Sequence, residues 1–142
     1  MVDSYRMYDT VLVSIDGSEP ANRAADHGLS IAAAFDADLH AIYVVDTRRY
    51  GRSSLGGSKT VLDELEELGE TILEEFDERS DVPVTTEIRR GRPHGAIDDY
   101  ASEIGADVIV LGNRGLGDPE GDEIGSVAER VVRYSGRPVL TA

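Results

Sequence analysis

Residues 107–131 read DVIVLGNRGLGDPEGDEIGSVAERV, and this stretch decides how the whole chain is interpreted. It begins with DVIVL at 107–111, a short run of mostly β-branched apolar residues that is typical of a strand buried on both faces. Its last residues open a helical pattern that runs from Ser126 to Tyr134. A strand, a glycine-rich loop and a helix in this order predict one unit of an α/β domain.

The loop between this strand and this helix is rich in glycine. Glycine lets the backbone take positive φ angles and lets bare N–H groups approach a phosphate closely. The helix that begins near Ser126 directs the positive end of its dipole at the same place. The loop therefore favours a phosphate-bearing ligand, and the alternative is a connection whose glycines serve only to turn the chain. The glycines are Gly112, Gly115, Gly117, Gly121 and Gly125.

The same alternation of strand and helix patterns runs through the rest of the chain. It predicts parallel strands joined by right-handed crossovers, with helices on both faces of the sheet. The predicted fold class is therefore α/β, an open five-stranded parallel sheet in a single domain over residues 1–142. Ligands of such sheets bind beyond the carboxyl ends of the strands, where the winding direction reverses. Strands are predicted at 10–15, 39–45, 83–89, 107–111 and 138–141, helices at 18–35, 61–76, 96–104 and 126–134, and a long polar loop at 46–59.

The charge balance is strongly acidic. The chain has 28 acidic and 14 basic residues, and Lys59 is the single lysine. Such a chain repels nucleic acid and anionic lipid, so neither is expected as a partner. Leucines at helical spacing run between the carboxylates of residues 62–79, which indicates a solvated helix face. Since ~1 M salt reduces the Debye length to roughly 3 Å, we interpret this as a halophilic protein; an ordinary acidic mesophile protein is the alternative.

Composition also excludes several classes of protein. There are no cysteines, so disulfides and thiolate chemistry are excluded, and the three histidines lack metal-site spacing. No stretch approaches the ~20 apolar residues that cross a bilayer. Residues 1–9 are polar and acidic, unlike a secretion signal, so a cytoplasmic protein is expected.

Enzyme classes that share this layout require motifs that the chain lacks. The first strand is followed by IDGSEPANR, which is neither a dinucleotide fingerprint nor a P-loop. A receiver domain would need an early acidic pair and a late lysine, and nucleotidyltransferases need a His-x-Gly-His run. His94 is interpreted as an exposed first-turn residue, and Asp98 and Asp99 as a solvated face, because adjacent helical residues diverge. No catalytic residue is predicted, and the chain is not expected to be an enzyme.

One pattern joins these features. Gly112, Gly115 and the pair Gly125-Ser126 follow the spacing G-x2-G-x9-G-S. The first predicted strand ends in IDGS at 15–18, the last carries RPVL at 137–140, and GRP at 91–93 precedes the third helix. In this order the chain resembles the universal stress protein family from end to end.

The resemblance implies a Rossmann-like, adenine-nucleotide-binding fold, often a homodimer paired through its last strand, and in one branch ATP bound without a dedicated reaction. By this likeness Asp16 would contact the ribose and Val44 the adenine; a turn former or helix cap and a core residue are the alternatives. A solvated loop residue is the alternative for Arg114. The remaining implied site residues are Leu111, Gly112, Arg114 and Gly115 at the sugar and phosphates, and Gly125, Ser126 and Val127 at the outer phosphates.

The loop departs from the family's nucleotide binders in one respect. It carries Asp118, Glu120, Asp122 and Glu123, where those proteins usually have neutral or basic residues. These carboxylates weaken triphosphate binding unless magnesium bridges them or salt screens them. The expected function is therefore a stress-response regulatory or protective protein that binds ATP, with magnesium. The alternative is a nucleotide-free universal stress protein that acts as a dimeric interaction module, and a slow ATPase is a distant third.

Overall fold

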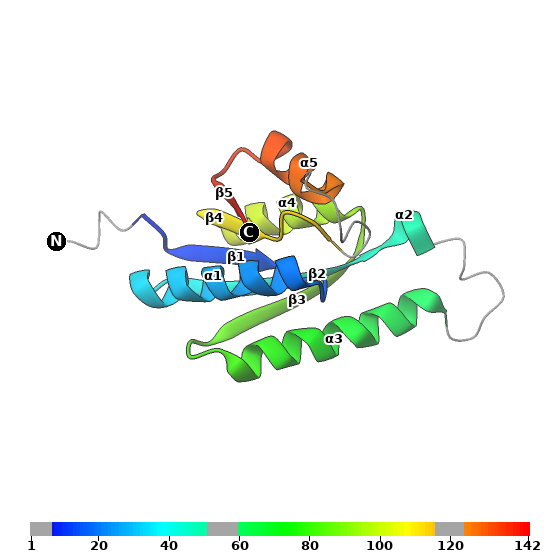
Figure 1. Cartoon of the computed structure of the whole chain (residues 1–142), viewed down its shortest axis with the longest axis horizontal. Helices are drawn as coiled ribbons and strands as arrows, with labels where there is room; N and C mark the ends of the chain where they lie inside the picture. Colours follow the sequence, from blue (N-terminus) through cyan, green and yellow to red (C-terminus); the bar gives the residue numbers. More distant parts are fainter. Residues whose placement is uncertain (1–6, 51–59, 116–123) are drawn as a thin grey trace.

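A computed structural model of the chain describes residues 7–50, 60–115 and 124–142. Helices and strands alternate through it, as the sequence predicts (Figure 1). The elements are β1 (Thr10–Ser14), α1 (Glu19–Phe35), β2 (Asp38–Asp46), α2 (Thr47–Tyr50), α3 (Val61–Arg79), β3 (Val84–Gly91), α4 (Pro93–Ile104), β4 (Val108–Leu111), α5 (Ser126–Tyr134) and β5 (Val139–Thr141).

The five strands form one parallel sheet in the order β3-β2-β1-β4-β5. The chain winds outward from β1 to β3, returns to the middle at β4 and continues outward to β5. The winding direction therefore reverses between β1 and β4, which is where ligands of such sheets bind. The predicted five-stranded parallel sheet is confirmed.

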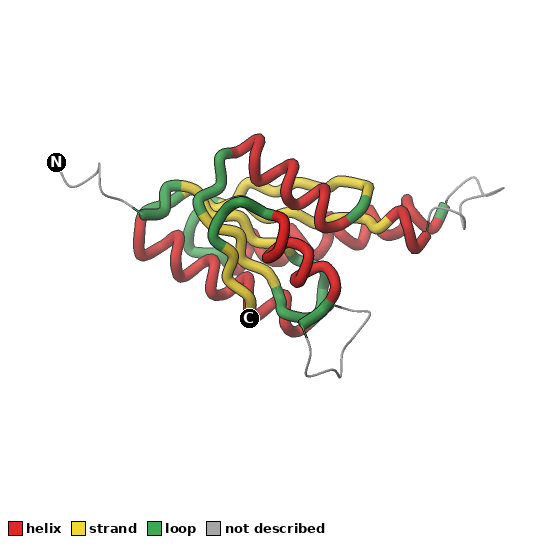
Figure 2. Tube along the Cα trace, turned by 90° about the horizontal axis from the view of Figure 1, so that it is seen from above, coloured by secondary structure: helices red, strands yellow, loops and turns green. Residues whose placement is uncertain are grey.

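Helices cover both faces of the sheet, and the alternation along β1 shows how. Val11 and Val13 point into a core with α1 and α3, where Phe76 is among the fully buried side chains. Leu12, between them, points to the opposite core, which contains Ile97 of α4. Successive strand residues face opposite sides of a sheet, so a continuous apolar run supplies both cores. Figure 2 shows helices along both sides of the strands.

Two predicted boundaries are wrong, each for a local reason. A polar loop was predicted at 46–59, but Asp46 is the last residue of β2 and residues 47–50 form α2. Residues 51–59 lie outside the described parts of the chain. The apolar pattern predicted the third helix over 96–104, whereas the helix begins at Pro93, so His94 lies in its first turn as predicted. Proline suits a first helical position because its ring fixes φ and its missing N–H needs no partner there.

The acidic face of α3 is confirmed. Its inner side buries Gly69, Leu73 and Phe76, and a capping box closes its beginning between Thr60 and Asp63. Its outer side exposes the carboxylates Glu64, Glu67, Glu70, Glu74, Glu75, Asp77 and Glu78. Neither α3 nor any other helix in the described ranges is long and apolar enough to cross a membrane.

We expect the free energy of unfolding to rise with potassium chloride from low to molar concentration. Glu70, Glu74 and Glu78 are four residues apart on one helix face, so their like charges repel, and salt screens that repulsion. Thermal melts at increasing salt measure the effect, and Glu74→Gln should show a smaller rise than the wild type. A flat or falling curve would favour the mesophile interpretation.

Candidate functional site

A cavity of about 380 Å³ lies at the carboxyl ends of β1, β2 and β4, where the winding direction reverses. Ser14 and Asp16 follow β1 into its wall, Val44 comes from β2, and Leu111 comes from β4. The loops after these three strands are the places that the fold class predicted for a ligand. The cavity volume falls within the range of roughly 300–1,000 Å³ that is usual for small-molecule sites.

All nine residues that the sequence resemblance implied line this one cavity. They come from four separate parts of the chain and meet because the carboxyl ends of parallel strands lie at one edge of the sheet. They are Asp16, Val44, Leu111, Gly112, Arg114, Gly115, Gly125, Ser126 and Val127.

Asp16 forms the turn after β1 and still faces the cavity. Its Oδ1 accepts the N–H of Ser18 at 2.9 Å, and the Ser18 hydroxyl oxygen accepts the N–H of Ala21 at 3.2 Å as the N-cap of α1. A Cβ atom built on Gly115 would lie 2.9 Å from Asp16 Oδ2, so the second oxygen faces the glycine loop. The turn-former interpretation is therefore correct, and it leaves one carboxylate oxygen directed at the site.

The glycine loop and the beginning of α5 form the polar end of the cavity. Gly125 is the N-cap of α5 and no side chain caps the helix. The N–H of Gly125 donates to the carbonyl oxygen of Asn113 at 2.6 Å, which fixes the helix start against the loop after β4. Ser126 and Val127 follow in the first turn, where backbone N–H groups have no acceptor inside the helix. Their position in the cavity wall places these donors and the positive end of the helix dipole beside the cavity.

Gly112 holds the loop close to α1. A Cβ atom at this position would lie 2.7 Å from the backbone nitrogen of Ala21, closer than real Cβ contacts allow. Ala21 also lines the cavity, so this contact sets the width of the site between β4 and α1.

The opposite end of the cavity is mainly apolar. Val44 is half-buried and packs on the core that contains Ile97, as the core interpretation has it, and it also lines the cavity, where contact with a ligand stays a prediction. Tyr43, Leu65 and Ile97 complete this wall. An apolar end beside a donor-rich end suits a ligand with a flat ring and a charged tail.

The sequence reasoning missed several residues in the wall, including Tyr43, Asp46, Arg48, Leu65, Pro93 and Ile97. One feature of the sequence could have indicated Asp46 and Arg48 as cavity residues, because they directly follow the carboxyl end of a predicted strand. Arg48 Nε lies 3.3 Å from Asp46 Oδ1, and its Nη2 lies 3.3 Å from Oδ2, so the two charges are paired. Leu65 and Ile97 belong to helical patterns that predict burial but no particular neighbour.

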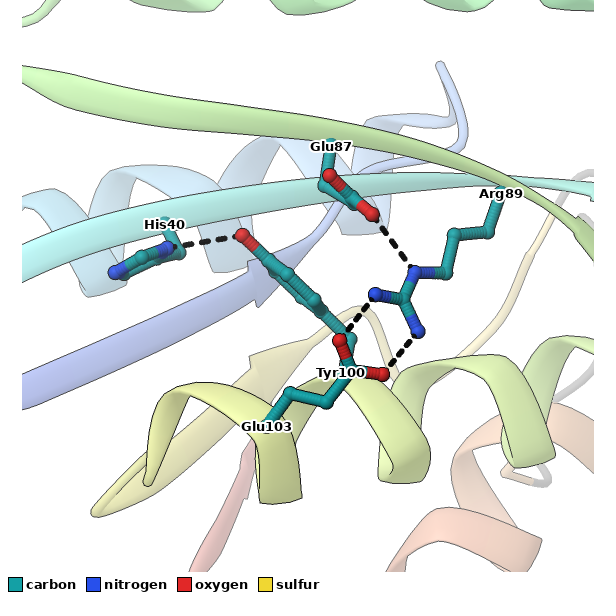
Figure 3. Close-up of polar contacts among 5 residues, drawn as sticks. All are labelled: His40, Glu87, Arg89, Tyr100 and Glu103. Carbon is teal, nitrogen blue, oxygen red and sulfur yellow. Dashed lines mark hydrogen bonds and ion pairs between the residues drawn. The ribbon is translucent and has the colours of Figure 1, made fainter.

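A polar cluster outside the cavity fixes α4 on the sheet (Figure 3). Arg89 of β3 binds Glu103 through two hydrogen bonds of 2.7 Å each and Glu87 through one of 2.8 Å. Its guanidinium lies 4.8 Å from the centre of the Tyr100 ring. The Tyr100 hydroxyl lies 3.0 Å from His40 Nδ1. Because α4 also carries Pro93 and Ile97 into the cavity wall, the cluster positions that wall.

Burial and charge set the protonation states of this cluster. Burial lowers the pKa of His40, while the carboxylate of Asp38 opposes the effect. Burial also raises the pKa of Tyr100. The hydrogen bonds from Arg89 lower the pKa of Glu103. Near neutral pH, His40 and Tyr100 are therefore uncharged, and Arg89 and Glu103 form an ion pair.

The helix residues considered for catalysis are placed differently from one another. His94 is half-buried in the first turn of α4 rather than exposed. Asp98 is half-buried, 3.8 Å from Arg137, so it is not simply solvated, whereas Asp99 is exposed as predicted. Within residues 7–50, 60–115 and 124–142, no group of three or more His, Asp or Glu side chains is arranged to hold a metal ion.

The sheet order defines a doubly wound α/β domain with a cavity at its switch point. The model of the universal stress protein family matches residues 7–142. Universal stress protein MJ0531 of Methanocaldococcus jannaschii is 35% identical over 138 residues, which cover 94% of this chain and 81% of that protein. The chain therefore belongs to the universal stress protein family, as the resemblance predicted.

Solved structures agree with this assignment. The structure of hypothetical protein MJ0577 superposes with a TM-score of 0.84 at 27% identity, and the match covers 96% of both chains. A universal stress protein in complex with cAMP has a TM-score of 0.65 at 27% identity, with 95% of this chain and 96% of that chain covered.

Proposed function

We propose that this chain is a stress-response regulatory or protective protein that binds an adenine nucleotide, ATP with magnesium, in the cavity at the switch point. The observation that carries the proposal is the convergence of nine residues from four parts of the chain on one cavity. The complex of a similar protein with cAMP supports an adenine nucleotide as the ligand class.

The cavity suggests an orientation for the nucleotide. The adenine fits the apolar end at Val44, and Asp16 Oδ2 is available to accept a ribose hydroxyl. The phosphates fit the donor-rich end at Gly112–Gly115 and Gly125–Val127, where backbone N–H groups and the start of α5 favour negative charge. Magnesium would bind to the phosphate oxygens and neutralise part of their charge. The acidic residues Asp118, Glu120, Asp122 and Glu123 lie outside the described residues.

The proposal is for binding without catalysis. Two carboxylates are present among the described residues of the cavity wall, those of Asp16 and Asp46. Asp16 Oδ1 accepts the N–H of Ser18, and Asp46 is paired with Arg48. In the proposed complex Asp16 Oδ2 would bind a ribose hydroxyl and Asp46 would stay paired with Arg48, so neither carboxylate would lie beside the terminal phosphate as a general base.

Isothermal titration calorimetry with ATP and magnesium, in low and in molar potassium chloride, tests the proposal. We expect one nucleotide per chain, and tighter binding of ATP than of GTP because the apolar end selects the base. If neither salt condition gives binding heat or a rise in melting temperature, the nucleotide-free alternative replaces the proposal.

We also propose a homodimer paired through β5, in which the two last strands run antiparallel. β5 lies at the edge of the sheet with β4 as its neighbour, and Leu140 is 39% exposed. Pro138 precedes the strand, where a missing N–H costs little. An edge without a charged residue favours pairing with a second copy.

We expect the wild type to sediment as a dimer at micromolar concentration and Leu140→Lys to sediment as a monomer. Lysine on an edge strand opposes pairing because the two lysines of a symmetric pair would lie on the same face of the joined sheet, where their like charges repel. Leu68→Lys is the matched control, since Leu68 is 49% exposed on α3, which packs on β2 and β3 rather than β5. A monomeric wild type would contradict the dimer.

A further inference from the structure

Three arginines lie in the cavity wall or close in sequence to residues of that wall, in a chain whose net charge is −14. Arg48 lines the cavity itself. Arg92 is the N-cap residue of α4, directly before Pro93, which lines the cavity. Arg130 is on α5, one helical turn after Ser126, which also lines the cavity.

Helix geometry places Arg130 in a surface strip that consists of Ser126, Arg130 and Tyr134 of α5 and His94 of α4. Ser126, Arg130 and Tyr134 are four residues apart on α5 and therefore lie on one face of the helix. The Tyr134 ring meets the ring of His94 on α4, with 6.4 Å between ring centres. Helices α4 and α5 pack against each other, so the strip runs from the cavity wall along their junction.

The electrostatics of His94 agree with this placement. Burial lowers its pKa most, and the positive charges of Arg130, Arg92 and Arg48 lower it further, while Asp98 opposes them. Three guanidinium groups therefore act on one imidazole ring from three different elements. Near neutral pH His94 is uncharged, and one of its ring nitrogens can donate a hydrogen bond.

Two of these arginines lack the carboxylate partners that others have. Arg79, Arg89, Arg90, Arg133 and Arg137 all form ion pairs. Arg92 and Arg130 form none with any residue in the described parts of the chain. Like charges that gather without partners repel each other, and a bound anion would relieve that repulsion.

We propose that Arg92, His94 and Arg130 form a phosphate subsite that continues the cavity beyond the glycine loop and selects nucleotides with a chain of three or more phosphates. This inference rests on the proposed nucleotide site, because the chain of phosphates enters the subsite from the beginning of α5. Guanidinium groups match phosphate oxygens through paired hydrogen bonds. In this arrangement Gly112–Gly115 binds the phosphates nearest the ribose, and the first turn of α5 and the arginines together bind the outer phosphates.

Calorimetry with AMP and with ATP, at constant low salt, tests the subsite. We expect Arg92→Gln/Arg130→Gln to weaken ATP binding about tenfold or more while AMP binding stays unchanged. Arg92→Lys/Arg130→Lys should bind ATP more tightly than the glutamine double variant but less tightly than the wild type. Lysine keeps the positive charge but lacks the paired N–H donors of a guanidinium group. Arg79→Gln controls for the loss of one positive charge at the end of α3, outside the cavity wall, and the single variants Arg92→Gln and Arg130→Gln are each compared with it. Equal losses for AMP and ATP, or no loss for ATP, would overturn the subsite.

Inorganic tripolyphosphate separates this inference from the proposed function. If the wild type binds tripolyphosphate but no nucleotide, and the glutamine double variant binds neither, the subsite is supported and the nucleotide proposal fails. If both proteins bind tripolyphosphate equally, the subsite fails whatever the nucleotides do. If the wild type binds neither tripolyphosphate nor ATP, both proposals fail.

Discussion

Gly125→Val is expected to abolish the rise in melting temperature that ATP with magnesium gives the wild type. At a ligand concentration of 100 Kd, binding stabilises the folded state by about 2.7 kcal/mol, which corresponds to roughly 5–10 °C for a domain of this size. A Cβ atom on Gly125 would lie 3.2 Å from Arg114 Cα and 3.4 Å from the carbonyl oxygen of Asn113. A valine is therefore expected to shift the start of α5 away from the glycine loop and to cover the N–H groups that would face the phosphates in the proposed complex.

Gly136→Val is the matched control for this experiment. A Cβ atom at Gly136 meets nothing within 4 Å, and the residue lies between α5 and β5, outside the cavity wall. The control should keep the full ATP-dependent rise. Differential scanning fluorimetry with and without ATP measures both variants, each against its own ligand-free melting temperature. If Gly125→Val keeps the wild-type rise in melting temperature with ATP, the glycine loop is not part of the nucleotide site.

The sequence was most informative where one local pattern dictates one geometry. The apolar runs at 10–15 and 107–111 required strands buried on both faces, and the alternation with helices then required a parallel sheet. Since the carboxyl ends of those strands meet at one edge, residues as distant as Asp16 and Ser126 were expected at one site. Both line the same cavity.

The sequence was least informative where the geometry depends on strand register and helix placement. Arg89 meets Glu103 because β3 is paired with β2 in one register and α4 crosses both. Nothing in the sequence around either residue indicates this partner. The effect of Arg92 and Arg130 on His94 was equally invisible, because each arginine taken alone reads as a solvated surface residue.

The small residues of α1 predicted that this helix could pack closely on β1. The sequence showed that the helix could approach the sheet, but not which residue sets the distance. A Cβ atom on Gly28 would lie 2.1 Å from Val13 Cγ1, far inside any real contact. Val13 is fully buried in the central strand, so its side chain has little room to move away. Gly28 thus determines how closely α1 lies on the sheet, and α1 carries Ala21 to the cavity wall.

Gly28→Ala is therefore expected to lower the free energy of unfolding by roughly 1–3 kcal/mol, the usual cost of overpacking, although alanine favours helices. Val13→Ala alone should cost about 2 kcal/mol through the cavity that it leaves. In the double variant the new methyl group enters that cavity, where the next atoms are 3.6 Å and 3.7 Å away. Gly28→Ala should then stabilise the Val13→Ala protein, with a coupling energy of about 1 kcal/mol or more.

Urea denaturation of the four proteins measures this cycle, and Gly95→Ala supplies the control for helix propensity. Gly95 lies in α4 with nothing within 4 Å of an added Cβ atom, so alanine there should stabilise the protein by about 0.5–1 kcal/mol. Alanine is thus expected to lower the free energy of unfolding at Gly28 and to raise it at Gly95, because Val13 lies against Gly28 and no atom lies against Gly95. If Gly28→Ala and Val13→Ala are additive, the methyl group of Val13 does not limit the approach of α1 to the sheet. The cavity wall at Ala21 would then be set by the contact at Gly112 instead.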